Sequence, residues 1–173
     1  MHRNIMPSNI LISSAERNSL LNDVVIAKAS VNLGNEQLTQ AGTIFGDVAY
    51  MSPELLGSGH TADCRSDIFQ LGATLYALLT GRPPFGGGSV SETIKHVLTA
   101  APKPIRDCHI ATPPQFDAVV QKMLQKNPRD RFQNAAELAV SLKHVAAELG
   151  QKKVKAYQID PKATGWRGAL DGL

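Results

Sequence analysis

The stretch SDIFQLGATLYALLTG, residues 66–81, predicts a helix that forms the centre of the fold. Apolar side chains occupy nearly all sides of this helix, and a helix that is apolar all round is a buried one. Ser66 is the predicted N-cap, and Thr80 with Gly81 marks the predicted end. Asp67 lies in the first turn, where the helix dipole favours a carboxylate that can also accept hydrogen bonds from a neighbouring loop.

Three more helices are predicted after this one, each from a pattern that begins a helix. A side-chain cap of this kind stabilises a helix by about 1 kcal/mol. The patterns are SVSE (89–92, helix to about Thr99), TPPQ (112–115, with Pro113 in the first helical position and a helix to about Gln125) and NAAE (134–137, helix to Gly150).

The rest of the chain is less regular. Residues 9–12 form a short apolar run that suits a buried strand, whereas residues 30–46 have no periodicity and are predicted to be a long loop. Residues 149–173 are basic and then rich in Pro and Gly, which predicts a tail or linker. Trp166 is the one residue of this tail expected to make a strong contact, either by packing back on the domain or by contacting a partner. The fold is therefore expected to be mainly α, with a strand or two at the front.

Composition excludes several classes of protein. The chain has 173 residues with 43% hydrophobic and 19% charged residues, which is typical of a folded soluble domain. A net charge of +3 with scattered basic residues argues against a nucleic-acid partner. No apolar run approaches the roughly 18 residues of a membrane span. Cys64 and Cys108 have no metal-binding spacing and are expected to be reduced thiols, as in a cytoplasmic protein.

Several short motifs follow one another in a specific order. They are HRNIMPSNIL, which holds His2, Arg3, Asn4 and Asn9; Asp23-Val24-Val25; GDVAYMSPE, which ends at Glu54; the central helix with the TGRPPF that follows it; and NPRDRF, which holds Arg131. In this order they resemble the C-terminal lobe of the eukaryotic-type Ser/Thr protein kinases of bacteria, over residues 1–148. Each motif is weak alone, whereas the ordered set at familiar spacings is specific.

The resemblance implies a mainly α, kinase-like C-terminal lobe with a short β-hairpin at the front. It implies phosphoryl transfer from ATP to Ser or Thr of a protein substrate, with ATP and Mg²⁺ bound through Asn9 and Asp23. It also implies an ion pair between Glu54 and Arg131. The residues with an implied structural role are His2, Arg3, Glu54, Asp67 and Arg131.

Positions at the reacting centre depart from the family's pattern. Asn4 stands where the family has the Asp that accepts the substrate's proton, and loss of a general base costs roughly 10²–10⁴ in rate. Met6 stands where a Lys steadies the transferring phosphate, so that charge is missing. Asp47 stands where a Thr contacts both of those residues. Val25 replaces the Gly of the metal-binding loop, and a β-branched residue resists unusual dihedral angles.

The changes at Asn4, Met6 and Asp47 are compatible in charge. One hypothesis is that the Asn4 amide donates a hydrogen bond to the Asp47 carboxylate, since two neighbouring carboxylates would repel each other. The alternative is an Asp47 side chain that points to solvent. A third version makes Asp47 a displaced proton acceptor, although Met6 then leaves the phosphate charge uncompensated.

The chain begins inside the catalytic-loop motif, so the glycine-rich loop, the ATP-contacting Lys and the hinge of the family are expected to be missing from it. We therefore expect a kinase-family domain that is catalytically inactive as this chain stands. Three alternatives stay open: a piece of a longer kinase with some activity, a pseudokinase lobe that binds partner proteins, and a non-functional gene remnant. Intact helix caps and apolar faces argue against unconstrained decay.

Overall fold

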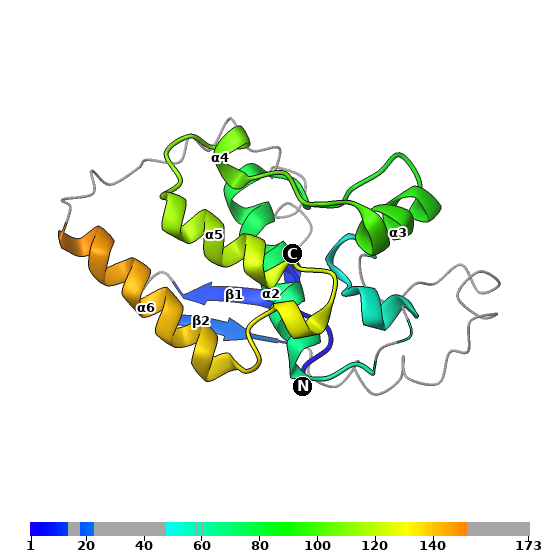
Figure 1. Ribbon diagram of the computed structural model, residues 1–173, viewed down its shortest axis with the longest axis horizontal. Helices are drawn as coiled ribbons and strands as arrows, with labels where there is room; N and C mark the ends of the chain where they lie inside the picture. Colours follow the sequence, from blue (N-terminus) through cyan, green and yellow to red (C-terminus); the bar gives the residue numbers. More distant parts are fainter. Residues whose placement is uncertain (14–17, 23–47, 58, 60, 152–173) are drawn as a thin grey trace.

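A mainly helical fold with a two-stranded hairpin near the N-terminus is confirmed (Figure 1). The computed structural model describes residues 1–13, 18–22, 48–57, 59 and 61–151. In chain order the elements are the 3-10 helix η1 (Pro7–Asn9), strands β1 (Ile10–Ser13) and β2 (Asn18–Leu21), the 3-10 helices η3 (Val48–Tyr50) and η4 (Pro53–Leu56), helices α2 (Cys64–Thr80), α3 (Val90–Thr99), α4 (Ile105–Cys108) and α5 (Pro114–Met123), the 3-10 helix η5 (Pro128–Asp130) and helix α6 (Ala135–Gln151).

Some of the predictions concern residues outside these ranges. They are the metal-ligand role of Asp23, the effect of Val25, the loop at 30–46, the Asp47 pair and the Trp166 anchor. These stay predictions, as does the boundary near residue 148 between the kinase-like region and the tail.

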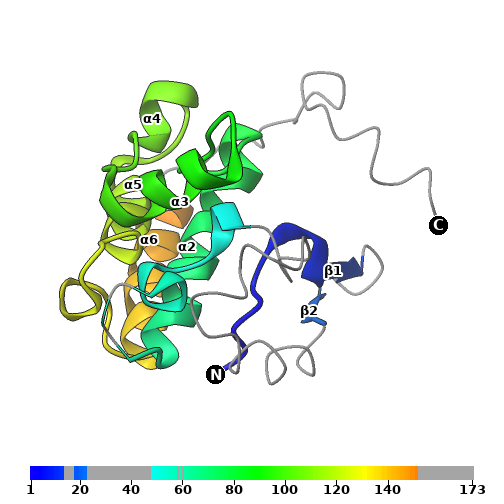
Figure 2. The same cartoon turned by 90° about the vertical axis from the view of Figure 1, so that its right-hand side faces the viewer.

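Helix α2 lies between the hairpin and helices α5 and α6 (Figure 2). Nine of its 17 residues are buried, compared with two of ten in α3 and three of ten in α5, so α2 is the most buried of these three helices. It is not buried on every side, however, and some of its buried residues are polar. Leu78 and Leu79 in the last turn are 46% and 36% exposed, whereas Ser66, Gln70 and Thr74 are buried. The buried polar groups are tolerated because each forms hydrogen bonds, described below.

The main core forms around the aromatic and small side chains of α2. Gly72 allows α5 to approach closely, because a Cβ at this position would lie 2.8 Å from the Met123 Cβ. The buried members of the core cluster are Phe69, Ala73, Tyr76, Phe85, Val97, Ile105, Val120 and Leu124. A second cluster, between α2, α5 and α6, contains Ile68, Met123, Phe132 and Leu138.

Ser66 was the wrong N-cap for the central helix. Helix α2 begins at Cys64, and the Asp63 carboxylate caps it by accepting a hydrogen bond from Arg65 N at 2.9 Å. The Ser66 hydroxyl instead donates to Glu54 Oε1 at 2.7 Å. Ser66 is fully buried inside the helix, so its hydroxyl bonds to a buried carboxylate rather than to the helix end.

The cap predicted for α3 is confirmed. Ser89 Oγ accepts a hydrogen bond from Glu92 N at 3.2 Å, and the Glu92 carboxylate accepts one from Gly88 N at 2.7 Å. Helix α6 likewise begins after Asn134, whose side chain accepts from Glu137 N at 2.9 Å. It ends at Gln151, one residue beyond the predicted end.

The cap predicted for α5 was wrong. Pro113 is the N-cap rather than the first helical residue, and Pro114 begins the helix. A residue that precedes a proline is pushed out of the helical region, and Pro113 accordingly has an extended ψ of 137°. The Thr112 hydroxyl lies 3.0 Å from His109 Nδ1 instead of capping the helix.

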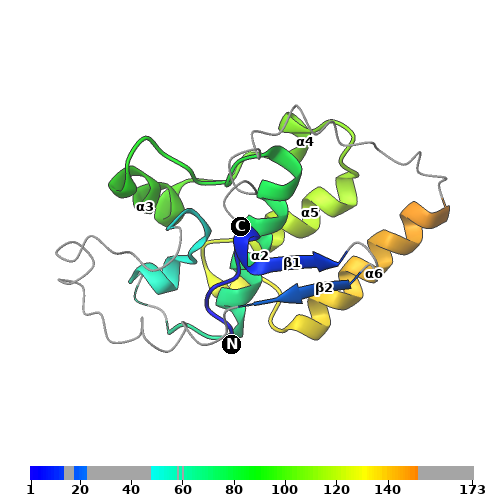
Figure 3. The same cartoon turned by 180° about the vertical axis from the view of Figure 1, so that it is seen from behind.

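The hairpin exposes much of its apolar surface, so the prediction of a buried strand at 9–12 was wrong. The two strands are antiparallel, with Leu11 paired with Leu20. Leu11, Ile12 and Leu20 are 53%, 73% and 65% exposed. The physical reason is that the sheet has two strands and lies on the side of α2 away from α5 and α6, so within the described residues no further helix packs on its outer face (Figures 2 and 3). Within the described residues, no helix is both long and apolar enough to span a membrane.

Candidate functional site

The N-terminal segment, residues 2–5, is attached to α2 through its backbone. The Asp67 carboxylate accepts hydrogen bonds from His2 N at 2.8 Å and from Arg3 N at 2.7 Å. These are the bonds from a neighbouring loop that the position of Asp67 in the first turn of the helix predicted.

Two further side chains of α2 contact the same backbone. Gln70 Oε1 accepts a hydrogen bond from Ile5 N at 3.2 Å, and Gln70 Nε2 donates one to Arg3 O at 3.0 Å. The Thr74 hydroxyl lies 3.4 Å from Ile5 O and 2.9 Å from Gln70 O, its own helical carbonyl neighbour. Positions 67, 70 and 74 share one face of the helix, so a single face of α2 holds the segment.

Arg3 has a left-handed backbone, with φ at 68°. Such a conformation costs roughly 1–2 kcal/mol for a residue with a side chain. The N–H of Arg3 donates to Asp67 and its carbonyl accepts from Gln70. These two bonds hold the strained turn in place immediately before Asn4.

Asn4, Met6 and Asn9 come together in the turn that follows. Asn9 Nδ2 donates a hydrogen bond to Asn4 O at 2.9 Å, and Asn9 N donates to Met6 O at 3.0 Å. The Asn9 side chain is buried, and the Ser8 hydroxyl lies 3.5 Å from its Oδ1. None of these side chains can ionise at neutral pH, so this turn contributes neither a proton acceptor nor a positive charge.

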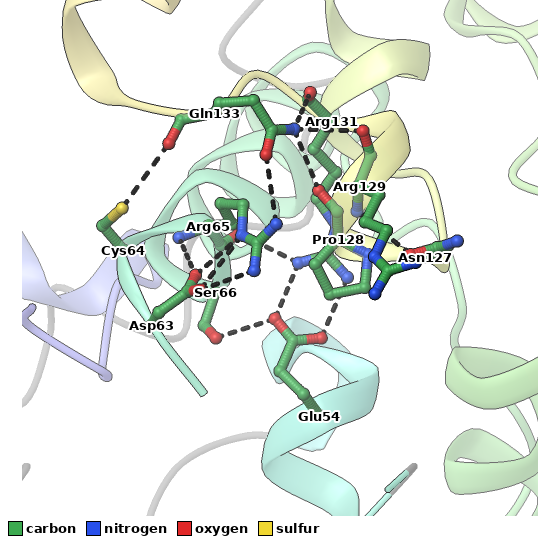
Figure 4. Close-up of polar contacts among 10 residues, drawn as sticks. All are labelled: Glu54, Asp63, Cys64, Arg65, Ser66, Asn127, Pro128, Arg129, Arg131 and Gln133. Atoms are coloured by element: carbon green, nitrogen blue, oxygen red, sulfur yellow. Dashed lines mark hydrogen bonds and ion pairs between the residues drawn. The ribbon is translucent and has the colours of Figure 1, made fainter. Parts of the chain in front are cut away.

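Glu54 and Arg131 form the predicted ion pair (Figure 4). Arg131 Nη1 lies 2.7 Å from Glu54 Oε1, and Nη2 lies 2.9 Å from Oε2, which makes the pair bidentate. The two side chains are 0% and 1% exposed. The contact ties η4 to the segment after η5, across α2.

Every N–H of the Arg131 guanidinium has an acceptor. Besides the two bonds to Glu54, Nε donates to Gln125 O at 2.7 Å, Nη1 to Arg65 O at 2.9 Å and Nη2 to Lys126 O at 3.0 Å. Full satisfaction of the donors is what makes burial of this charge tolerable.

The pKa of Glu54 is set by opposing effects. Burial alone would raise the pKa of this carboxyl, but the hydrogen bonds and charge of Arg131, together with the Ser66 hydroxyl, outweigh burial and hold the pKa below its usual value. Glu54 is therefore ionised at neutral pH, and the pair consists of two full charges.

A second set of polar contacts lies beside the ion pair in Figure 4. Arg65 Nη2 lies 2.6 Å from Asp63 Oδ2, and Arg65 Nη1 donates to Gln133 Oε1 at 3.0 Å. The Cys64 thiol lies 3.7 Å from Gln133 O. These contacts fasten the start of α2 to the chain that leads into α6.

Comparison with known proteins identifies the family. The family model described as the protein kinase domain matches residues 1–144. Serine/threonine-protein kinase PknB of Mycolicibacterium smegmatis is 42% identical over 143 residues, which is 82% of this chain and 22% of that protein. PknB of Mycobacterium tuberculosis is 41% identical over 146 residues, or 84% of this chain and 23% of that protein. The chain belongs to the eukaryotic-type Ser/Thr protein kinase family. PknE of Mycobacterium tuberculosis is 36% identical over 152 residues, or 88% of this chain and 26% of that protein.

This kinase-family chain spans about a quarter of the length of these relatives. Of the predicted site residues, the structure brings His2 and Arg3 to Asp67. It also brings Asn4 and Met6 to Asn9, and Glu54 to Arg131. Asp23 and Asp47 lie outside the described residues, so the roles of the metal-ligand pair and of the Asn4–Asp47 pair stay predictions. Within the described ranges, no group of three or more His, Cys, Asp or Glu side chains could hold a metal ion.

Sequence reasoning missed two residues that support the kinase-family site, Ser66 and Gln70. Both are polar residues in a helix that was expected to be apolar on nearly all sides. That mismatch was the available signal, because a buried polar side chain needs a hydrogen-bond partner. The partners themselves could not be inferred, since Glu54 and the Arg3 carbonyl belong to distant segments.

Lys126 is a partly buried cation next to this network. Its Nζ donates to Val97 O at 2.6 Å and to His96 O at 3.3 Å, at the end of α3. The same atom lies 3.4 Å from the centroid of the Phe85 ring. Burial lowers the pKa of Lys126 to about 7, and the nearby Arg131 charge adds to the effect.

We expect Lys126 to make the stability of the fold depend on pH. Between its folded pKa of about 7 and the ordinary lysine value, the unfolded chain binds more protons than the folded chain. The free energy of unfolding therefore rises with pH across this window. Urea unfolding at several pH values, for the unmodified chain and for Lys126→Met, measures this contribution. The difference between the two should grow in favour of the unmodified chain as pH rises, and a constant difference would contradict the assignment.

Proposed function

We propose that this kinase-family chain does not transfer phosphate to protein substrates. The observation that carries the proposal is the presence of Asn4 and Met6 on a segment whose backbone α2 holds in place. By resemblance, position 4 is where the family has the Asp that accepts the proton, and position 6 is where it has the Lys that steadies the phosphate. An amide and a thioether supply neither function.

The surroundings of these two positions support a specific loss rather than general decay. The segment keeps its bonds to Asp67, and the Glu54–Arg131 pair has all its donors satisfied. Breaking a buried ion pair costs several kcal/mol, so selection for a stable fold would keep the pair, whereas unconstrained decay would not. We infer that the fold is maintained while the chemistry is absent.

The protein kinase family uses ATP and Mg²⁺, which supply the phosphoryl group and neutralise its charge. Asn9 fits a ligand for such a cation. Because its Nδ2 is engaged with Asn4 O, the carbonyl oxygen Oδ1 remains as the coordinating atom, and Mg²⁺ prefers oxygen ligands. Asn9, with Asp23 by resemblance, would hold the metal, so nucleotide binding is compatible with loss of transfer.

A second candidate function is that of a protein-binding module. The observation in its favour is the exposed apolar surface of the hairpin, where Leu11, Ile12 and Leu20 are each more than half exposed. Exposed apolar patches are typical of surfaces that contact another protein. The free thiols Cys64 and Cys108 suit a reducing compartment, and we propose a cytoplasmic location.

The proposal is tested by phosphate transfer from radiolabelled ATP. The purified 173-residue chain, supplied with Mg²⁺ and a general protein substrate, should incorporate no more label than its Asp23→Ala variant. The reason is that positions 4 and 6 provide no base and no cation. Incorporation by the unmodified chain that disappears in Asp23→Ala would contradict the proposal. An active kinase run in parallel shows that the substrate and the assay are sound.

A further inference from the structure

Gln70 is a buried polar residue whose contacts surround Asn4. Its side chain is 2% exposed. Its amide binds the backbone on both sides of Asn4, since Oε1 accepts from Ile5 N at 3.2 Å and Nε2 donates to Arg3 O at 3.0 Å. One side-chain amide thus pairs with the two peptide groups that flank Asn4, in the way that one strand pairs with another.

The orientation of this amide is fixed by its partners. A backbone N–H can donate but cannot accept, and a backbone carbonyl can accept but cannot donate. The oxygen of Gln70 must therefore face Ile5, and the nitrogen must face Arg3. The reverse orientation would put two donors together at Ile5 and two acceptors together at Arg3.

The same reasoning connects Asn4 to Asn9. Asn4 O accepts the hydrogen bond from Asn9 Nδ2 at 2.9 Å, which sets the direction of the Asn9 carboxamide and leaves Oδ1 on its other side. Asn9 does not contact α2 through this amide, so its direction depends on where the Asn4 peptide lies. Asp67 holds the N–H groups of His2 and Arg3, whereas Gln70 binds the peptide groups directly before and after Asn4.

We propose that Gln70 is a positioning residue, which fixes the Asn4 peptide and, through it, the direction of the Asn9 carboxamide. The role applies whether or not the chain transfers phosphate, so it goes beyond the proposed function. It also differs from simple attachment of the N-terminal segment, because Asp67 and Thr74 can attach the segment without controlling Asn9.

The test measures hydrogen exchange of side-chain and backbone amides by NMR, in the 173-residue chain without nucleotide. Gln70→Met removes both hydrogen bonds and keeps a long side chain in the helix. We expect the Asn9 carboxamide and the Ile5 backbone amide to exchange at least about tenfold faster than in the unmodified chain, since each loses or loosens a buried hydrogen bond. The matched control is Thr74→Val, which removes the other side-chain polar contact to Ile5 and keeps the shape.

Thr74→Val should leave exchange of the Asn9 carboxamide within about threefold of the unmodified chain, because its 3.4 Å contact is a weak one. The proposal is overturned if Gln70→Met accelerates Ile5 but leaves Asn9 unchanged, since Gln70 would then be an anchor alone. It is also overturned if both variants accelerate Asn9 equally. Phosphate transfer does not enter the measurement, so its outcome is independent of the activity assay.

A second measurement keeps the proposal testable if Gln70→Met does not fold. In the unmodified chain, the side-chain amide protons of Gln70 and Asn9 should both be protected from exchange, because both bonds belong to one connected set. Protection of Asn9 together with free exchange of Gln70 would show that the Asn9 carboxamide keeps its direction without Gln70, and would overturn the proposal.

Discussion

Replacing Arg131 with methionine is expected to lower the free energy of unfolding by about 3–5 kcal/mol, enough to unfold much of the protein at room temperature. The substitution leaves the ionised Glu54 carboxylate buried with the Ser66 hydroxyl as its remaining side-chain donor. It also removes the three donors that serve the carbonyls of Gln125, Lys126 and Arg65. Urea unfolding followed by circular dichroism measures the change.

The matched control for Arg131→Met is Arg129→Met. Arg129 lies two residues earlier, in η5, and its side chain is exposed. Its removal should change the free energy of unfolding by less than about 0.5 kcal/mol, as is usual for surface substitutions. Equal effects of the two substitutions would mean that the buried pair does not stabilise the fold. In addition, Glu54→Gln introduced into Arg131→Met should recover part of the loss, because it removes the uncompensated charge.

Gly72→Ala is expected to destabilise the fold by about 1–3 kcal/mol, although alanine favours a helix. The added methyl group would lie 2.8 Å from Met123 Cβ and 3.3 Å from Leu124 Cδ2. Met123 Cβ is attached directly to the backbone of α5, so it cannot move without moving the helix. The two helices must therefore separate, and the core between them must repack. Thermal unfolding monitored by calorimetry would show the loss.

Gly150→Ala is the matched control for Gly72→Ala, and we expect it to have the opposite effect on stability. Gly150 lies within α6, and a Cβ at this position would meet nothing within 4 Å. The substitution should therefore stabilise the chain or leave it unchanged, by up to about 1 kcal/mol, through helix propensity alone. Destabilisation by both glycine substitutions would show that close packing against α5 is not the cause at Gly72.

The sequence predicted well those features that depend on neighbouring residues. The caps at Ser89 and Asn134 are local, because the donor and the acceptor lie within four positions of each other. The errors at Ser66 and Thr112 have equally local causes. In the first case Asp63, three residues earlier, caps the helix in place of Ser66. In the second, Pro114 keeps Pro113 out of the helical conformation.

Features that depend on distant segments could be predicted in part. The Glu54–Arg131 pair was expected from the resemblance, since nothing in the spacing of the two residues indicates that they meet. The exposure of Leu11 and Leu20 could not be predicted, because an apolar run shows what a strand can bury and not whether another element covers it. The partners of Gln70 lie on a segment more than 60 residues away in sequence.

The distance along the chain between Glu54 and Arg131 has a consequence for the rates of folding and unfolding. The two residues are 77 positions apart, and closing so long a loop costs more conformational entropy than forming a helical turn. The contact is therefore expected to form late, after the helices on either side have docked. An interaction that is missing from the folding transition state slows unfolding without accelerating folding. The pair thus lengthens the lifetime of the folded state, so the chain opens less often to proteases.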